Sequence, residues 1–304
     1  MSQSAWESEK YKLTPNPPAD YSIVREIGRG TYGIVFLGAI KQNYKCVIKV
    51  YTLLDVELVK RECFFLKQAE HRNVVKLLDV VQTPYNALIL EFCNSTPFDE
   101  VVKSLTPQLV SNYIFQLMNA IAYLHSKQIM HRDIKPTNIL FNNNKRTIKL
   151  IDFGLADFYV VGLKYTTRVG SLYYKPPEIL LGISEYTPAI DVWAAGCVLA
   201  QMIIRPKPLF TGSCEEDILI EIVKVLGTPV IVDFQRKEKV KIERRLAFKI
   251  AGRQKIDFEE ITTKGFAKHK TSGLVSLLNE LLEFNYKRRI SADQIIKNHT
   301  MYFF

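Results

Sequence analysis

The residues best suited to chemistry lie in one short segment, His131 to Asn138, and in a second that begins at Asp152 after an apolar run. A carboxylate such as that of Asp133 can accept the proton of a hydroxyl group. Carboxylate and amide oxygens, as in Asp152 and Asn138, are ligands that Mg²⁺ prefers. Lys135 could neutralise charge on a transferring phosphoryl group. These residue types could together serve phosphoryl transfer, with Asp133 as the base and Asn138 and Asp152 as metal ligands.

A lysine also interrupts the apolar run from Val47 to Val50. An ammonium group inside such a run is costly unless it meets an anion. Two anions are available, a nucleotide phosphate and the carboxylate of Glu62 on the stretch that follows. We expect Lys49 to pair with Glu62 and to align the phosphates. The alternative, a lysine that only extends its amine to solvent, would need the other motifs to be missing.

Three glycines, Gly28, Gly30 and Gly33, are spaced as G-x-G-x-x-G. Glycine allows backbone N–H groups to approach phosphate oxygens closely. The pattern alone also occurs in dinucleotide-binding folds and in plain glycine turns. Because β-type residues flank it on both sides, it favours a hairpin lid over the phosphates. The nucleotide contacts predicted in this lid are Ile27, Gly28, Arg29, Gly30, Thr31, Tyr32, Gly33, Ile34 and Val35.

Two kinds of element must position these groups. Short β-type runs extend from residue 21 to 90, with one helix expected over about 56–69. Beyond residue 97 the apolar residues recur at helical spacing. We expect an α+β fold in which a small antiparallel β-rich lobe, about 21–92, precedes a larger helical lobe, about 96–304, with a ligand cleft between them. Residues 1–20 form an irregular leading segment, and helices are expected at 109–126, 188–204, 215–226, 272–284 and 291–297.

Composition is that of a globular protein, with 304 residues, 47% of them hydrophobic and 24% charged. The net charge of +10 suits an acidic partner. The basic run from Arg236 to Lys255 is interpreted as a solvated helical face, with no aromatic interleaving that would indicate specific nucleic-acid binding.

Five dispersed cysteines suit a reducing compartment. No apolar stretch is long enough for a bilayer and no secretory signal is recognised, so we expect a soluble intracellular protein.

Taken together and in order, these motifs resemble those of the eukaryotic protein kinases along residues 21–304. Lys135 within His-Arg-Asp-Ile-Lys-Pro-Thr-Asn resembles the serine/threonine pattern. The resemblance implies the bilobal protein kinase fold and ATP and Mg²⁺ as cofactors. Glu178 and Arg289 stand where the family forms a buried ion pair. Beyond the lid, the nucleotide contacts that it implies are Val47, Lys49, Glu91, Cys93 and Leu140.

Within that family the chain is most similar to the casein kinase II catalytic subunit. The resemblance is carried by Leu150-Ile151-Asp152, by Gly154-Leu155-Ala156-x-Phe158-Tyr159 and by Tyr165-x-x-Arg168-Val169-x-Ser171. It implies acidic protein substrates contacted by Arg168, Ser171 and Lys175. It also implies a regulatory β-subunit dimer on the small lobe and a location in cytoplasm and nucleus. Trp6 and its neighbours would keep the enzyme constitutively active.

Some positions depart from that pattern. Leu53 to Leu58 replaces a lysine-rich cluster, and Leu172 and Phe153 replace an arginine and a tryptophan of the family. One alternative is therefore a relative of the cyclin-dependent or glycogen-synthase kinases, activated by phosphate on Thr166 or Thr167. A pseudokinase scaffold is the alternative from another class. A nucleic-acid-binding protein is suggested by net charge alone.

Overall fold

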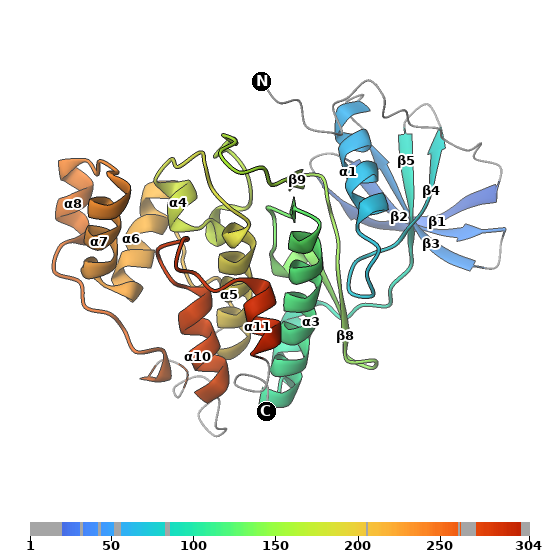
Figure 1. Cartoon of the computed structure of the whole chain (residues 1–304). Coiled ribbons are helices and arrows are strands. Elements are labelled where there is room, and N and C mark those ends of the chain that lie inside the picture. The colour runs from blue at the N-terminus through green and yellow to red at the C-terminus, as the bar shows by residue number, and fades with distance from the viewer. Residues whose placement is uncertain are drawn as a thin grey trace.

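The computed structural model describes residues 20–30, 33–41, 44–51, 56–82, 86–204, 206–260, 262 and 272–298. Within this part of the chain, a small lobe built on an antiparallel sheet is followed by a larger, mostly helical lobe (Figure 1). The α+β architecture and the order of its lobes agree with the sequence expectation. The leading segment before residue 20 lies outside the described residues.

The sheet of the small lobe has the strand order β1-β2-β3-β5-β4 among the described residues. Every neighbouring pair is antiparallel. In β3, alternate residues point to opposite faces, so that Cys46 and Ile48 join one apolar cluster while Lys49 and Tyr51 point to the other face. The strands are β1 (Tyr21–Arg29), β2 (Gly33–Ile40), β3 (Tyr44–Tyr51), β4 (Leu77–Gln82) and β5 (Asn86–Glu91).

Helix α1 (Val56–Gln68) is the main helix of the small lobe and packs against β4 and β5. Its buried residues include Val59, Cys63 and Leu66, which recur at intervals of three and four residues. The helix expected from the sequence over about 56–69 is present within one residue, whereas β4 is not among the expected strands. That strand has the same length as β5, but Asp79 interrupts its apolar run, whereas β5 has four consecutive buried residues.

Helix α5 (Ala189–Ile203) lies at the centre of the helical lobe, where 14 of its 15 residues are buried. It is apolar on every side, as a helix enclosed by others must be, and it packs on α3 and α10. Helix α3 begins at Thr106, whose hydroxyl accepts a hydrogen bond from the backbone N–H of Leu109. The surrounding helices are α2 (Phe98–Val101), α3 (Pro107–Ser126), α4 (Pro177–Leu180), α6 (Glu215–Leu226), α10 (Ser272–Leu281) and α11 (Ala292–Lys297).

Two small two-stranded sheets lie beside the junction of the lobes and hold the loops that carry the chemical motifs. Strand β6 (Ile129–Met130) pairs with β9 (Asp157–Phe158), and β7 (Ile139–Asn142) pairs with β8 (Thr147–Leu150). The loop from β6 to β7 contains Asp133, and the loop from β8 to β9 contains Asp152. Both loops are therefore held at each end by a strand.

The basic run is not one helical face. Helix α7 (Thr228–Glu238) ends where Lys239 adopts a left-handed backbone conformation with φ of 55°. The next residues, Val240 and Ile242, are β-branched and disfavour helix, and α8 (Arg244–Ile250) begins only beyond them. The charged run thus spans two helices and a connection. Among the described helices, none is long and apolar enough to cross a membrane.

Candidate active site

Lys49 lies between two carboxylates at the junction of the lobes. Its Nζ is 2.7 Å from Oε2 of Glu62 and 3.0 Å from Oδ1 of Asp152. Tyr51, two residues along the same face of β3, donates its hydroxyl hydrogen bond to Glu62. Strand β3, helix α1 and the loop after β8 therefore meet at this ammonium group. The Lys49–Glu62 pair expected from the sequence is present, whereas the contact from Tyr51 is not expected from it.

The two carboxylates keep Lys49 charged. Burial alone would lower the pKa of its ammonium group, but Glu62 and Asp152 outweigh burial and raise that pKa. Burial raises the pKa of the Glu62 carboxyl, and Lys49 offsets only part of this effect. At Asp152 burial acts in the same direction, but Lys49 prevails and holds the pKa below its ordinary value. A cation fixed in this way is suited to an anionic ligand.

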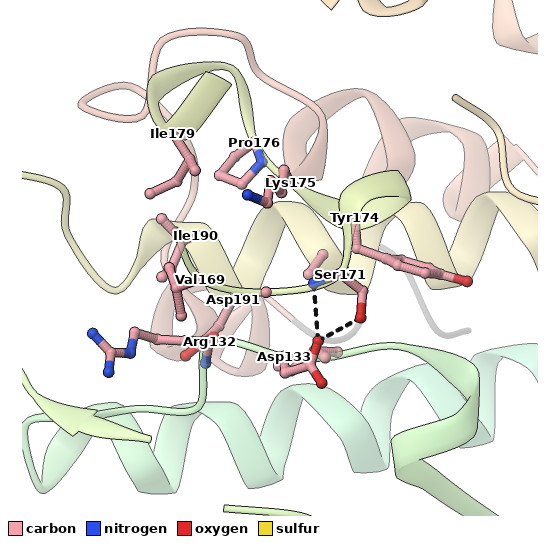
Figure 2. Close-up of a pocket in the computed structure, with 13 residues that line it drawn as sticks. Arg132, Asp133, Val169, Ser171, Tyr174, Lys175, Pro176, Ile179, Ile190 and Asp191 are labelled. Atoms are coloured by element: carbon pink, nitrogen blue, oxygen red, sulfur yellow. Dashed lines mark hydrogen bonds between the residues drawn. The ribbon is translucent and has the colours of Figure 1, made fainter. Parts of the chain in front are cut away.

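Asp133 is 9% exposed and is held from several sides. Its Oδ1 accepts hydrogen bonds from the backbone N–H of Ser171 at 3.1 Å and from the Ser171 hydroxyl at 2.8 Å (Figure 2). Its Oδ2 lies 2.8 Å from Nζ of Lys135 and accepts a hydrogen bond from Asn138 at 2.9 Å. Lys135 also donates to the Ser171 hydroxyl. These contacts fix both the position and the orientation of the carboxylate.

The loop that carries Asp133 is anchored to α5 by Asp191. Its two carboxylate oxygens accept the backbone N–H groups of His131 at 2.9 Å and Arg132 at 2.8 Å. Arg132 has a φ of 65° and Asp152 a φ of 67°, both in the left-handed region. Residues other than glycine adopt this conformation at an energetic cost, and such positions cluster at functional sites. The anchor at Asp191 helps to maintain it.

Asn138 and Asp152 are the residues that could hold Mg²⁺. The Asn138 amide donates both of its described hydrogen bonds to Asp133, and its Oδ1 accepts none from the described residues. The Asp152 side chain is 43% exposed although it contacts Lys49. Mg²⁺ is commonly bound by one or two protein oxygens together with nucleotide phosphates. The amide and carboxylate oxygens present therefore fit this cation.

The glycine-rich segment forms the turn between β1 and β2. Its ends are joined by a hydrogen bond from the Gly30 N–H to the Gly33 carbonyl at 2.9 Å. A Cβ atom on Gly33 would lie 2.2 Å from the Val50 carbonyl oxygen, so a side chain cannot be accommodated there without movement of the backbone. The predicted hairpin lid is thus present, with strands on both sides. Thr31 and Tyr32, two of the predicted contacts, lie outside the described residues.

The other predicted nucleotide contacts come from β3, β5, β7 and the connection between the lobes. Val47 pairs with Leu90 across β3 and β5. Glu91, at the end of β5, forms an ion pair with Lys149 at 2.6 Å. Cys93 follows it in the connection, and burial together with Glu91 raises the pKa of its thiol to about 11. Leu140 lies on β7, opposite Lys149. These residues lie on the elements that border the junction of the lobes.

The three predicted substrate residues differ in whether their side chains already have partners within the protein. Ser171 is bonded to Asp133 and Lys135 as described. The Lys175 Nζ forms an ion pair with Glu215 of α6 at 2.6 Å, and its side chain is 10% exposed. Arg168 is exposed, and its guanidinium group has no ion-pair partner in the described part of the chain. Only Arg168 therefore offers an uncompensated charge, and the sequence analysis does not anticipate Glu215.

Arg132, which the sequence analysis considers as a receiver of phosphate, already has an anionic partner. Its guanidinium lies 3.0 Å from Oδ2 of Asp157, and it donates to the Leu155 carbonyl and the Tyr186 hydroxyl. Its side chain is 3% exposed. No local pattern in the sequence indicates that Asp157 would meet Arg132, because Arg132 lies in the loop after β6 and Asp157 lies on β9, 25 residues further along the chain.

The cavity beside Asp133 is small. It lies between the loop carrying Asp133, the segment from Val169 to Pro176 and the first turns of α5 (Figure 2). Its volume of about 20 Å³ has room for water rather than for a nucleotide. It therefore belongs to the support of the Asp133 loop.

A buried ion pair holds α4, which follows the segment from Val169 to Pro176, to the rest of the helical lobe. Arg289 binds Glu178 through Nη1 at 2.7 Å and Nη2 at 3.0 Å, and both side chains are fully buried. Arg289 also donates to the Ala189 carbonyl, and its guanidinium lies 5.0 Å from the ring of Trp193. The ion pair that the sequence resemblance implies is present.

Comparison with known families gives a result for almost the whole chain. A family model described as "Protein kinase domain" matches residues 21–301. The match covers every predicted catalytic, nucleotide, metal and substrate residue.

Proposed function

Because this chain belongs to the protein kinase family, we propose that it transfers the γ-phosphoryl group of ATP to serine and threonine side chains of proteins. The observation that carries the proposal is the joint position of Asp133 and Lys135. A carboxylate and an ammonium group lie 2.8 Å apart, both in contact with the Ser171 hydroxyl. A substrate hydroxyl has the same chemistry as that of Ser171.

In the proposed reaction, a carboxylate oxygen of Asp133 accepts the proton of the substrate hydroxyl as its oxygen attacks the γ-phosphorus. Lys135 neutralises charge on the phosphoryl oxygens in the transition state. Lys49, kept charged by its two carboxylates, binds the phosphates that remain on the nucleotide. Asn138 and Asp152 would hold Mg²⁺, which neutralises phosphate charge when bound. The glycine-rich turn covers the phosphates with backbone N–H groups.

The test is transfer of labelled phosphate from ATP in the presence of Mg²⁺ to three peptides that differ only in serine, threonine or tyrosine at the target position. We expect labelling of the serine and threonine peptides. Asp133→Asn should lower kcat by about 10²- to 10⁴-fold, the usual contribution of a general base. Asp99→Asn, a change at an exposed carboxylate of α2, serves as the matched control. Labelling of the tyrosine peptide alone, or unchanged kcat in Asp133→Asn, would contradict the proposal.

A finer proposal, based on sequence resemblance, is that the enzyme is of the casein kinase II type and prefers acidic substrates. Arg168 supports it as an exposed cation in the segment next to Asp133, whereas Lys175 is neutralised by Glu215. We therefore assign the preference to Arg168. Peptides with and without Asp and Glu after the target serine test this, and Arg168→Ala should abolish the difference in KM. Equal KM values for the two peptides with the native enzyme would exclude it.

We also propose that activity does not require phosphate on Thr166 or Thr167. The Arg132–Asp157 ion pair supports this, because the guanidinium group that could bind a phosphate is already paired with a carboxylate. Phosphatase-treated enzyme should remain active, and Asp157→Ala should lower its activity. Activity that appears only after phosphorylation of either threonine would favour the alternative of a cyclin-dependent or glycogen-synthase kinase type.

The resemblance to the casein kinase II catalytic subunit is also our basis for proposing a β-subunit dimer as partner and a location in cytoplasm and nucleus.

A further inference from the structure

The basic run from Arg236 to Lys255 takes no part in the site described above. It contains nine Lys and Arg residues and two Glu residues, so these 20 residues carry +7 of the chain's net +10. The run covers the end of α7, the connection and α8. Both helices lie at the end of the helical lobe farthest from the sheet of the small lobe (Figure 1). A charge of this size in one place needs an explanation.

Part of this charge is compensated within the molecule. Arg236 and Lys237 both form ion pairs with Asp233, and Lys249 pairs with Glu216 of α6 at 2.5 Å. Within the described residues, Lys241, Arg244 and Arg245 have no ion-pair partner, and all three are exposed. Lys239, Arg253 and Lys255 are likewise exposed and without an ion pair among the described residues, so the uncompensated charge extends along the connection and past α8. Around the start of α8 it comprises Lys241, Arg244 and Arg245, beside the exposed carboxylate of Glu243.

Phe248 lies on the same helix and is 86% exposed, more than any other large apolar side chain in the described part of the chain. Arg244 and Phe248 are four residues apart and Arg245 and Phe248 three, so both arginines neighbour the ring on the helix surface. A large aromatic ring surrounded by arginine is typical of protein interfaces, where both residue types are enriched. Lys241, Arg244, Arg245 and Phe248 together are called the α8 surface below.

We propose that the α8 surface binds an acidic segment of a partner protein. Carboxylates of the segment would pair with Lys241, Arg244 and Arg245, and an apolar side chain of the segment would cover Phe248. Complementary charge steers such a segment to the surface and sets its orientation. The apolar contact supplies affinity that salt does not screen, because it arises from removal of apolar area from water.

Two other classes of anionic partner fit less well. A membrane surface requires an apolar helix face, but the remaining large apolar side chains of α8, Leu246 and Ile250, pack into the core. Single-stranded nucleic acid is bound by several aromatic side chains on which successive bases stack. Phe248 is the one aromatic residue between Arg236 and Lys255. An acidic protein segment needs only the single ring and the adjacent cations.

The α8 surface is connected to the segment beside Asp133. Glu216, which pairs with Lys249 of α8, directly follows Glu215, which pairs with Lys175. The first turn of α6 therefore links α8 to the loop that contains Ser171. A partner segment bound at the α8 surface could therefore extend along α6 towards the loop that contains Ser171. Binding at the α8 surface does not depend on phosphate transfer.

The test is fluorescence anisotropy with the full chain and a labelled 14-residue peptide that contains Asp and Glu around one leucine and lacks Ser, Thr and Tyr. Binding should weaken on raising the salt concentration. Arg244→Glu/Arg245→Glu should weaken binding at least about tenfold, and Phe248→Ala by about fivefold to tenfold, as for contacts at the centre of an interface. A peptide with Asn and Gln in place of the acids should not bind.

The matched control is Lys103→Glu/Lys145→Glu, which changes net charge equally at exposed lysines elsewhere. It should leave the Kd unchanged. An equal loss in this control would overturn the proposal, because the effect would then come from overall charge. An oligonucleotide or vesicles rich in phosphatidylserine that bind more tightly than the peptide, and lose binding in Phe248→Ala, would also overturn it. Because the peptide cannot be phosphorylated, failure here is distinguishable from failure of the proposed kinase activity.

Discussion

Lys49 illustrates how one residue depends on partners that are remote in sequence. Its ammonium group is held by Glu62, 13 residues away, and by Asp152, 103 residues away. Because Glu62 is 1% exposed, it needs this cation to remain charged in the interior. The same contacts support the fold and hold the proposed phosphate ligand, and mutation can separate the structural role from the proposed one.

Lys49→Met should abolish phosphate transfer and lower the free energy of unfolding by about 3 kcal/mol, because it leaves a buried carboxylate unpaired. Adding Glu62→Gln should restore most of the stability but none of the activity. Denaturant unfolding and the peptide assay measure the two effects. If the double variant were as unstable as Lys49→Met, the loss could not be ascribed to the unpaired Glu62 charge.

Asp191 predicts a pH dependence of stability. Burial acts to raise the pKa of its carboxyl, but the hydrogen bond and electrostatic interaction with His125, together with those of His131, outweigh burial, so the pKa lies below its ordinary value. The unfolded chain therefore takes up this proton at a higher pH than the folded protein does. The stabilisation is complete above the unfolded pKa of about 3.9 and is lost as the pH falls through the folded pKa.

Asp191→Asn should cost about 1.5–3 kcal/mol at neutral pH, the usual contribution of hydrogen bonds to a charged group. It should also flatten the decline of unfolding free energy below about pH 4. Asp293→Asn, at an exposed carboxylate of α11, is the control and should change neither quantity much. A decline as steep in Asp191→Asn as in the native protein would assign the acid sensitivity to other groups.

At the scale of elements, neighbouring arginines allow a direct comparison of buried and exposed ion pairs. Arg289 joins the segment after α10 to α4 through Glu178, with both side chains fully buried. Arg288 forms its ion pairs with Asp233 and Glu283 at the surface, where its side chain is 47% exposed. Solvent weakens surface pairs, whereas removal of one buried partner leaves an uncompensated charge.

Arg289→Ala should therefore lower the free energy of unfolding by about 3–5 kcal/mol, and Arg288→Ala by less than about 1 kcal/mol. Thermal and denaturant unfolding of the two variants measure the difference. Comparable losses of unfolding free energy in the two variants would show that burial does not decide how much the Glu178–Arg289 pair contributes to stability.

At the scale of the whole molecule, the proposed nucleotide site joins the two lobes, since Lys49 comes from the sheet and Asp152 from the helical lobe. A ligand that binds only the folded state stabilises it by mass action. ATP with Mg²⁺ at about 100 times its Kd should add about 2.7 kcal/mol to the free energy of unfolding. Asp152→Asn should reduce this gain, and ATP with a chelator is the control. Equal stabilisation with and without Mg²⁺ would contradict a role for Asp152 as its ligand.

The chemical groups of the candidate site could be predicted from the sequence because short spacing along the chain fixes them. Asp133 and Asn138 are five residues apart in one loop, and the glycines of the lid sit between two strand-like runs. A charge in an apolar strand requires an anionic partner, which leaves Glu62 and a nucleotide phosphate as candidates for Lys49, and the resemblance to kinases favours the Glu62 pair that the structure shows. The lobe order followed from the change from strand-like to helical periodicity.

Contacts between segments that carry no local signal were decided only by the tertiary structure. Tyr51 on Glu62, Asp157 on Arg132 and Glu215 on Lys175 each depend on how separate elements pack. The exposure of Phe248 likewise depends on which face of α8 the core covers. Sequence spacing determines which groups one loop or strand can present, because bond geometry fixes short distances. Charge compensation and exposure depend on distant segments, because only packing brings those together.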